Sequence, residues 1–252
     1  MPDTALIIVA RYPEPGKTKT RLAASIGAAA TAELYRAFLT DLARRFINQD
    51  YDLHWAYTPP ESDYSTFVTT LVTPSSVQSM QSMYCFPQQG IDLGQRLHHA
   101  FQWTHQHGYD YTILIGSDSP HISLETITNA RAALDEADIV LGPADDGGYY
   151  LIAMRKPHDV FSGIPMSTSV VTQMTIAMAH SQGLTVHLGE PLFDIDELPD
   201  LLRLAQLLEA DPSLAPATAA HLVTLRRFDD HYVPNHHSHV AALNLHRADQ
   251  SL

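Results

Sequence analysis

The sequence contains a single cysteine, Cys85, so no disulfide can form within the chain. A chain without disulfides is typical of a reducing compartment, and we expect a cytoplasmic protein. Positive charge is also scarce, because 15 Lys and Arg stand against 28 Asp and Glu and give a formal net charge of −13. Such a chain repels phosphate backbones and anionic lipid, so we expect neither nucleic acid nor a membrane surface as a partner.

The sequence also has no long hydrophobic run. The apolar run at residues 5–10 is followed by Arg11 and two prolines and is too short for the hydrophobic part of a signal peptide. No stretch approaches the roughly 20 apolar residues of a membrane span. We therefore expect neither a targeting segment nor a membrane span.

Short apolar runs alternate with segments of helical periodicity over residues 1–210. This alternation predicts a single α/β domain with a mainly parallel sheet and helices on both faces. For residues 211–252 we expect one more helix, at 215–227, and a polar, His-rich tail that is partly disordered. The expected strands are 5–10, 51–57, 82–86, 111–115, 139–141, 149–154 and 184–188, and the expected helices are 28–47, 93–107, 123–137, 168–181 and 197–208.

Ligands of such sheets bind beyond the carboxyl ends of the strands, so the loops there are the first places to consider. The loop after the first strand contains Gly16, which permits close approach to the backbone, and the cations Lys17, Lys19 and Arg21. Basic side chains concentrated in an acidic chain favour a phosphate ligand, and a solvated basic turn is the alternative. A P-loop is excluded, because its first glycine would have to stand where this chain has Arg11.

Acidic residues follow three of the other strands. The strand at 111–115 runs into Gly-Ser-Asp-Ser-Pro, which places Asp118 at its carboxyl end, where a carboxylate can hold a hard divalent cation. A helix cap is the alternative role, although Ser123 is the better cap candidate. Asp194 and Asp196 follow the last strand, and either would complete a magnesium site with Asp118.

Two further turns are weaker signals. The run Asp145-Asp146-Gly147-Gly148 lies between two strands, and it is either a plain hairpin turn or a turn whose glycines also admit a substrate. Asp92 lies between two glycines before an expected helix, where an N-terminal cap is at least as good an interpretation as a ligand role.

Together the motifs resemble the DUF2064 family over about residues 5–205. They are Arg-x-Pro-x-Pro-Gly-x-x-Lys-Thr-Arg-Leu, Gly-x-Asp-Leu-Gly-x-Arg, Ile-Gly-Ser-Asp-Ser-Pro, Gly-Pro-x-x-Asp-Gly-Gly-Tyr-Tyr-Leu and Asp-x-Asp. The family includes glycosyltransferases associated with radical-SAM proteins and arsenosugar biosynthesis. It is similar to GT-A glycosyltransferases and to guanylyltransferases of the molybdenum-cofactor type, so the resemblance implies a nucleotide-diphospho-sugar transferase fold.

The resemblance also implies roles for particular residues. It implies that Mg²⁺ or Mn²⁺ is bound by Asp118 with Asp194 and Asp196. An inverting enzyme also needs a base to activate the acceptor hydroxyl, and Asp146 is the candidate. Gly147, Gly148, Tyr149 and Met166 would line the sugar or acceptor, and Met166 stands where family members often have tryptophan. The residues expected to bind the nucleotide and its phosphates are Arg11, Gly16, Lys19, Arg21, Asp92 and Ser117.

The leading hypothesis is transfer of a sugar from a nucleotide-diphosphate sugar to a small acceptor. Nucleotidyl transfer from an NTP, with release of pyrophosphate, is the alternative, because both reactions use the same cations and metal. A non-catalytic nucleotide-binding partner of a radical-SAM enzyme is the third hypothesis. The sequence leaves the nucleobase, the sugar, the acceptor and the oligomeric state open.

Overall fold

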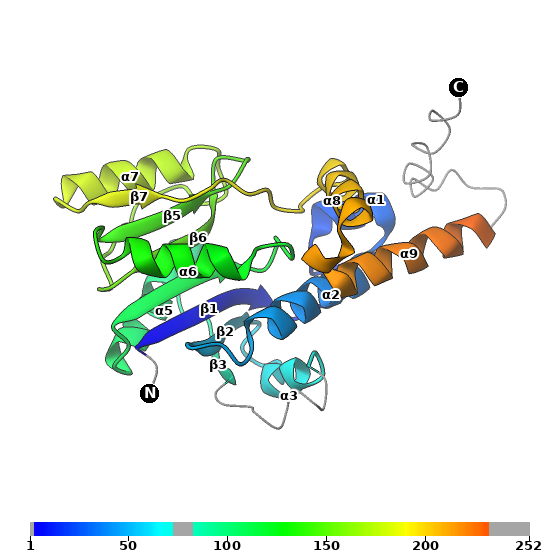
Figure 1. The fold of residues 1–252 in the computed structure, drawn as a ribbon, viewed down its shortest axis with the longest axis horizontal. Helices are drawn as coiled ribbons and strands as arrows, with labels where there is room; N and C mark the ends of the chain where they lie inside the picture. Colours follow the sequence, from blue (N-terminus) through cyan, green and yellow to red (C-terminus); the bar gives the residue numbers. More distant parts are fainter. Residues whose placement is uncertain (1–2, 73–82, 232–252) are drawn as a thin grey trace. The chain divides into compact units, whose positions relative to one another are not determined.

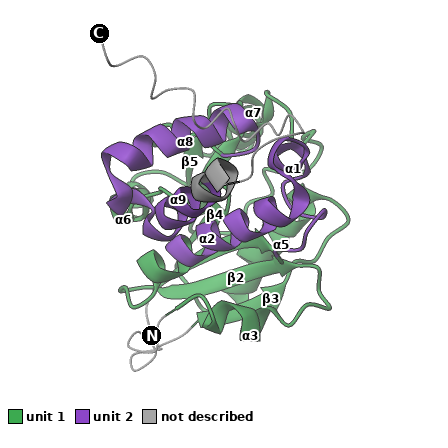
Figure 2. Cartoon of the chain, turned by 90° about the vertical axis from the view of Figure 1, so that its right-hand side faces the viewer, with its two compact units in different colours: residues 1–12, 42–194 green, residues 13–41, 195–252 purple. Residues whose placement is uncertain are grey.

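The computed structural model describes residues 3–72 and 83–231 of the chain (Figure 1). The chain divides into two compact units (Figure 2). Unit 1 consists of residues 1–12 and 42–194, and unit 2 consists of residues 13–41 and 195–252. Within the described ranges, no helix has the length and apolar character needed to cross a membrane.

Unit 1 contains a seven-stranded sheet in the order β3-β2-β1-β4-β6-β5-β7. All neighbouring strands pair in parallel except β6, which is antiparallel to both β4 and β5. The α/β class with a mainly parallel sheet is therefore confirmed. The strands are β1 (Thr4–Arg11), β2 (Asp52–Thr58), β3 (Met83–Pro87), β4 (Tyr111–Gly116), β5 (Ile139–Pro143), β6 (Tyr149–Met154) and β7 (Val186–Leu188).

Helices cover both faces of this sheet, as predicted. Leu141 and Ile152 pack in one buried cluster with residues of α5 (Leu93–Gln106) and α7 (Val171–Ser181). Their neighbours Val140 and Leu151 point to the opposite face, because side chains alternate along a strand, and there they meet α6 (Leu124–Ala133). The short helix α3 (Tyr64–Thr69) completes the described helices that lie wholly in unit 1.

Unit 2 is built from helices. They are α1 (Thr20–Ile26), most of α2 (Ala28–Phe46), α8 (Leu198–Ala210), η1 (Pro212–Leu214) and α9 (Pro216–His231). The four-residue rhythm predicted for α2 is confirmed, since Leu34, Phe38, Leu42 and Phe46 are all fully buried.

The buried carboxylate of Asp41 caps the N-terminus of α9. It accepts hydrogen bonds from the amides of Ala217 and Thr218 over 2.7 and 2.8 Å and from the Thr218 hydroxyl over 2.6 Å. These bonds satisfy amides that the first turn of a helix leaves without a partner. The helices α8 and α9 lie on either side of residue 210, the predicted domain boundary, and they contact each other within unit 2. The boundary itself stays a prediction.

The predicted elements agree with the observed ones to within a few residues, and α1 and α3 were not predicted. Residue 82, at the start of one expected strand, and the tail from residue 232 lie outside the described residues.

Candidate functional site

A pocket of about 260 Å³ in unit 1 lies at the edge of the sheet where β1 and β4 end. Because β6 runs antiparallel to β4, the first residues of β6 lie at this same edge. The amino-terminal turn of α5 and the loop before α7 complete the wall. This is the edge at which ligands of doubly wound sheets bind.

Asp118 lines this pocket, and β4 places it there. The strand is buried from Tyr111 to Ile115, and the chain then leaves the sheet through Gly116 and Ser117. Ser117 is also part of the pocket wall and is itself buried. The predicted helix cap is Ser123, whose hydroxyl accepts from the amide of Thr126 over 3.1 Å. Asp118 is therefore not the residue that caps α6.

Asp194 lines the same pocket, and Ser119 fixes its position. The buried Ser119 hydroxyl donates to Asp194 Oδ1 over 2.5 Å and lies 3.0 Å from the carbonyl oxygen of Phe193. Sequence reasoning did not identify Ser119 as a site residue. The two partners are 75 residues apart, so no local pattern could have shown the contact.

Asp146 belongs to a turn whose shape is set by α7. Its Oδ1 accepts from the amide of Gly148 over 2.8 Å. Thr172, in the first turn of α7, donates from its amide to the Gly147 carbonyl over 3.0 Å and from its hydroxyl to the Gly148 carbonyl over 2.5 Å. A Cβ on Gly147, which has φ +89°, would lie 2.1 Å from the Ser169 carbonyl oxygen. Gly147 is thus required by packing, whereas Asp146 and Gly148 line the pocket.

Tyr149 and Tyr150 both line the pocket, next to an irregularity in the β5–β6 ladder. The register shifts after Gly142, and the Tyr150 ring packs where a Cβ on Gly142 would be. Burial raises the pKa of Tyr149. Burial, together with the charges of Glu190 and Asp194, raises the pKa of Tyr150 to about 12. Both phenols are therefore protonated at neutral pH, and neither acts as a base.

Several of the other lining residues are apolar, which sequence reasoning missed because it considered mainly polar residues. Leu97 of α5, Leu114 of β4 and Ile152 of β6 line it and are buried. Met166, one of the predicted substrate-lining residues, lies half-buried in the loop before α7 and also lines the pocket. The sequence did contain this information, because side chains alternate between the two faces along β1 and β4. One row of aliphatic side chains on each strand therefore faces α5.

Asp118 and Asp194, which both line the pocket, could hold a divalent cation. Mg²⁺ commonly takes one or two carboxylates and completes its shell with phosphate oxygens and water. Two carboxylates from different loops of one pocket fit that donor set, as they fit Mn²⁺. Among the described residues, no group of three or more His, Cys, Asp or Glu could hold a metal. The pocket therefore fits a cation that is bound partly by these two carboxylates and partly by oxygen atoms of the substrate and water.

The other predicted metal ligand, Asp196, belongs to unit 2 with the basic residues. Lys19 is nearly buried, and its Nζ donates to the Ile195 carbonyl over 2.6 Å and lies 3.3 Å from Asp196 Oδ1. Arg21 is exposed, with its Nη1 3.8 Å from Asp196 Oδ2 and 3.7 Å from Glu197 Oε1. Lys19 thus has structural contacts, and the more exposed Arg21 is the freer of the two to meet a phosphate.

Three more predicted nucleotide-binding residues occupy defined positions. Arg11 is the exposed last residue of β1. Gly16 has φ +78°, which its turn requires, and is exposed. Asp92 is the N-cap of α5, where its carboxylate accepts from the amide of Gln95 over 2.8 Å. The capping role of Asp92 is therefore confirmed, and ligand roles for all three stay predictions.

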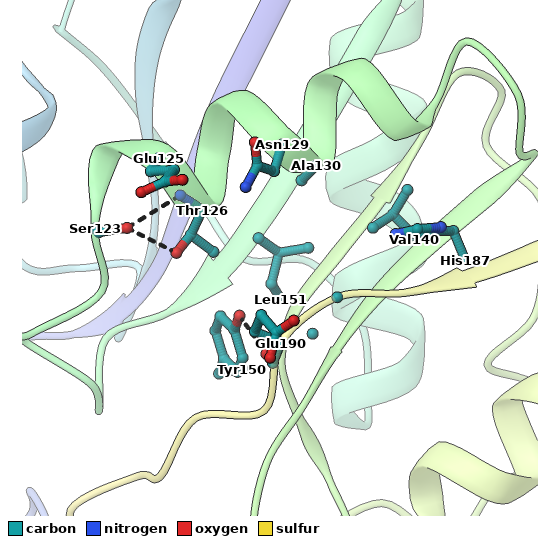
Figure 3. A pocket seen from close by; sticks show the side chains of 12 residues that line it. Ser123, Glu125, Thr126, Asn129, Ala130, Val140, Tyr150, Leu151, His187 and Glu190 are labelled. Atoms are coloured by element: carbon teal, nitrogen blue, oxygen red, sulfur yellow. Dashed lines mark hydrogen bonds between the residues drawn. The ribbon is translucent and has the colours of Figure 1, made fainter.

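A second pocket in unit 1, of about 270 Å³, lies between α6 and the strands β5, β6 and β7 (Figure 3). Val140 and Leu151 line it, and Glu190 and Asn129 lie at its rim. Tyr150 lines both pockets, and its hydroxyl donates to the Glu190 carbonyl over 3.0 Å. None of the residues predicted for the site lines this second pocket.

Comparison with solved structures gives the class of fold. A "putative nucleotide-diphospho-sugar transferase" from Desulfovibrio desulfuricans G20 is 33% identical, with TM-score 0.80 over 93% of this chain and 100% of that chain. A cytidylyltransferase from Leptospira borgpetersenii serovar Hardjo-bovis is 12% identical, with TM-score 0.52 over 94% of this chain and 100% of that chain. The 4-diphosphocytidyl-2C-methyl-D-erythritol synthase of Anaerococcus prevotii is 8% identical, with TM-score 0.52 over 82% and 96%. The fold is that of the nucleotide-diphospho-sugar transferases.

The family follows from the same comparison. The family model described as "Uncharacterized protein conserved in bacteria (DUF2064)" matches residues 47–168. With the identity to the Desulfovibrio protein over nearly the whole chain, this match shows that the chain belongs to the DUF2064 family. No curated protein matches the chain.

Proposed function

We propose that this protein transfers a sugar from a nucleotide-diphosphate sugar to the hydroxyl of a small acceptor, with Mg²⁺ or Mn²⁺ as cofactor. The observation that carries the proposal is the meeting of Asp118, Asp146 and Asp194 in one pocket at the ligand-binding edge of the sheet. The Desulfovibrio relative, described as a "putative nucleotide-diphospho-sugar transferase", supports the choice of a transferase reaction.

Asp118 and Asp194 are the proposed metal ligands. A bound divalent cation would neutralise charge on the diphosphate as it leaves. Ser119 is a positioning residue, because its hydroxyl holds Asp194. Asp196 stays a predicted ligand, and Arg11, Lys19 and Arg21 stay predicted phosphate-binding residues.

Asp146 is the proposed base. Its Oδ1 is held by the amide of Gly148, so Oδ2 is the atom that would receive the proton of the acceptor hydroxyl. In an inverting reaction the acceptor oxygen forms the new bond to the anomeric carbon. The bond from that carbon to the diphosphate breaks, and the nucleoside diphosphate leaves with the electron pair.

Product analysis tests the reaction type. The protein is incubated with Mg²⁺ and a panel of nucleotide sugars or NTPs together with mixed small acceptors. Release of a nucleoside diphosphate that depends on acceptor supports sugar transfer, whereas release of pyrophosphate from an NTP identifies nucleotidyl transfer instead. A thermal-shift screen of the same donors tests binding, since a ligand at 100 times its Kd stabilises by about 2.7 kcal/mol. If no donor binds with Mg²⁺, both transferase proposals fail.

The variant Asp146→Asn tests the base. We expect kcat to fall about 100-fold, because a positioned base contributes at least that much, and donor affinity to stay unchanged. The matched control is Asp145→Asn, because Asp145 is the neighbouring carboxylate in the same turn and does not line the pocket. Equal losses in the two variants would remove Asp146 from this role.

A further inference from the structure

The pocket that contains Asp118 has two chemically different groups of lining residues. Its carboxylates come from the loops after β4, before β6 and after β7. The second group, here called the aliphatic wall, consists of Val9, Leu97, Leu114, Ile152 and Val171, which come from β1, α5, β4, β6 and α7. Of these aliphatic residues Leu97, Leu114, Ile152 and Val171 are at most 5% exposed. The exposed residues Ser167 and Thr168, in the loop before α7, also line the pocket.

This wall offers a ligand few hydrogen-bonding groups. The backbone groups of Val9 and Leu114 face their neighbouring strands, because both residues lie within paired segments of the sheet. A hydroxyl placed against such a wall loses its bonds to water and gains none, which costs free energy. An acceptor that has hydroxyls on every side, such as a free polyol, is therefore a poor occupant of the space beside these aliphatic residues.

Two further apolar residues line the pocket. Leu93, at the start of α5, is 39% exposed. Met166, in the loop before α7, is half-buried and also packs against the buried cluster. A flexible thioether adapts to hydrocarbon groups of different shape. The apolar lining thus includes exposed as well as buried side chains.

We infer that the acceptor is an alcohol with a hydrocarbon body, alkyl or aryl. The hydrocarbon lies against Val9, Leu97 and Leu114, and the hydroxyl points to Asp118 and Asp146. This inference rests on the proposed sugar transfer and adds the acceptor class. The aliphatic wall would select hydrocarbon alcohols over polyols, because burial of hydrocarbon is favourable and burial of hydroxyls without hydrogen-bond partners is not.

The first experiment measures binding without any donor. Primary alcohols from ethanol to octanol are titrated against the full chain by NMR, with glycerol and sorbitol as polyols. We expect affinity to rise about fourfold for each added methylene until the wall is covered, and the polyols not to bind. Affinity that does not depend on chain length overturns the inference.

Variants test whether the alcohols bind at the aliphatic wall of the pocket that contains Asp118. Val9→Thr keeps the branched shape but adds a hydroxyl to the wall, and we expect it to weaken hexanol binding several-fold. Leu97→Met keeps the wall apolar and should leave affinity nearly unchanged. Val140→Thr is the matched control, because Val140 lines the second pocket. Equal weakening in Val9→Thr and Val140→Thr overturns the inference, and chemical shifts of the free variants check that each is folded.

Turnover separates this inference from the proposed function. With a donor that binds, transfer to hexanol but not to glycerol supports both. Transfer to glycerol as efficient as transfer to hexanol overturns the acceptor class and leaves sugar transfer standing. Alcohol binding without transfer from any bound donor overturns the proposed sugar transfer, and with it the assignment of the bound alcohol as an acceptor.

Discussion

The two pockets of unit 1 are similar in volume, about 260 and 270 Å³, and Tyr150 lines both, but they differ in their carboxylates. In the second pocket, the carboxylates are those of Glu125 in α6 and Glu190 after β7, and Ser123 and Thr126 bond to each other at the start of α6, as Figure 3 shows. In the first pocket, the carboxylates come from three loops that are distant in sequence. The comparison teaches that position at the strand ends distinguishes the candidate site, whereas size does not.

The largest effect is expected from neutralising one carboxylate in each pocket. Asp118→Asn should lower turnover about 1,000-fold, as losing one group that stabilises developing charge commonly does. Glu190→Gln removes the same charge at the second pocket and retains the Glu190 carbonyl that accepts from Tyr150. Steady-state rates with saturating Mg²⁺ measure both variants. If Glu190→Gln lowers the rate as much as Asp118→Asn, the conclusion that the first pocket rather than the second is the active site is contradicted.

The next effect concerns a glycine beside each pocket. Gly147→Ala should lower the free energy of unfolding by about 3 kcal/mol, because its Cβ would meet backbone at positive φ. Gly142→Ala should cost only about 1–2 kcal/mol, because its Cβ would meet the end of the Tyr150 ring, which can move. Urea denaturation measures both. A larger loss for Gly142→Ala would show that the ring is fixed and the turn is not.

A third effect, smaller than that of Gly147→Ala, concerns the dependence of stability on pH. His54 is buried among the rings of Tyr84, Trp103 and Tyr109, and burial lowers its pKa to about 4. Its unfolded pKa is about 6.5, so the stability this neutral ring contributes is complete above pH 6.5 and is lost as the pH falls toward 4. Between pH 7 and pH 5 we expect a loss of about 2 kcal/mol in the free energy of unfolding.

The control for this prediction is His54→Phe, which keeps an aromatic ring but cannot titrate. His54 lines neither pocket. The variant should therefore keep its activity at pH 7 while its stability becomes less dependent on pH. An unchanged pH dependence of the urea midpoint would assign the acid sensitivity to other groups. If the folded His54→Phe variant is less active at pH 5 than at pH 7, that loss of activity would be due to titration of groups in the first pocket.

Much of the fold could be predicted because the buried strands are continuous apolar runs. A hairpin turn between β5 and β6 was one of the two interpretations of the Asp145–Gly148 run, and the two strands do pair antiparallel, since only five residues separate them and a parallel crossover needs a dozen or more. The helices α1 and α3 have seven and six residues, too few for a helical period to be recognised. Their formation depends on tertiary contacts that local sequence does not contain.

The candidate site was only partly predictable for a related reason. Asp118, Asp146 and Asp194 follow or precede strands, so the sheet rule places them at one edge, and they line one pocket. Ser119 and Thr172 were missed because each acts through a hydrogen bond to a residue at least 24 positions away. Asp92 shows the converse, since its cap role was visible locally.

The length of β7 has a consequence for self-association. The strand lies at one edge of the sheet and has only three residues, Val186–Leu188. An edge strand is a template on which another chain can extend the sheet, and a short one offers few backbone groups for such pairing. The strand that closes the sheet beside the second pocket is thus a poor starting point for aggregation, and lengthening its paired segment would remove that protection.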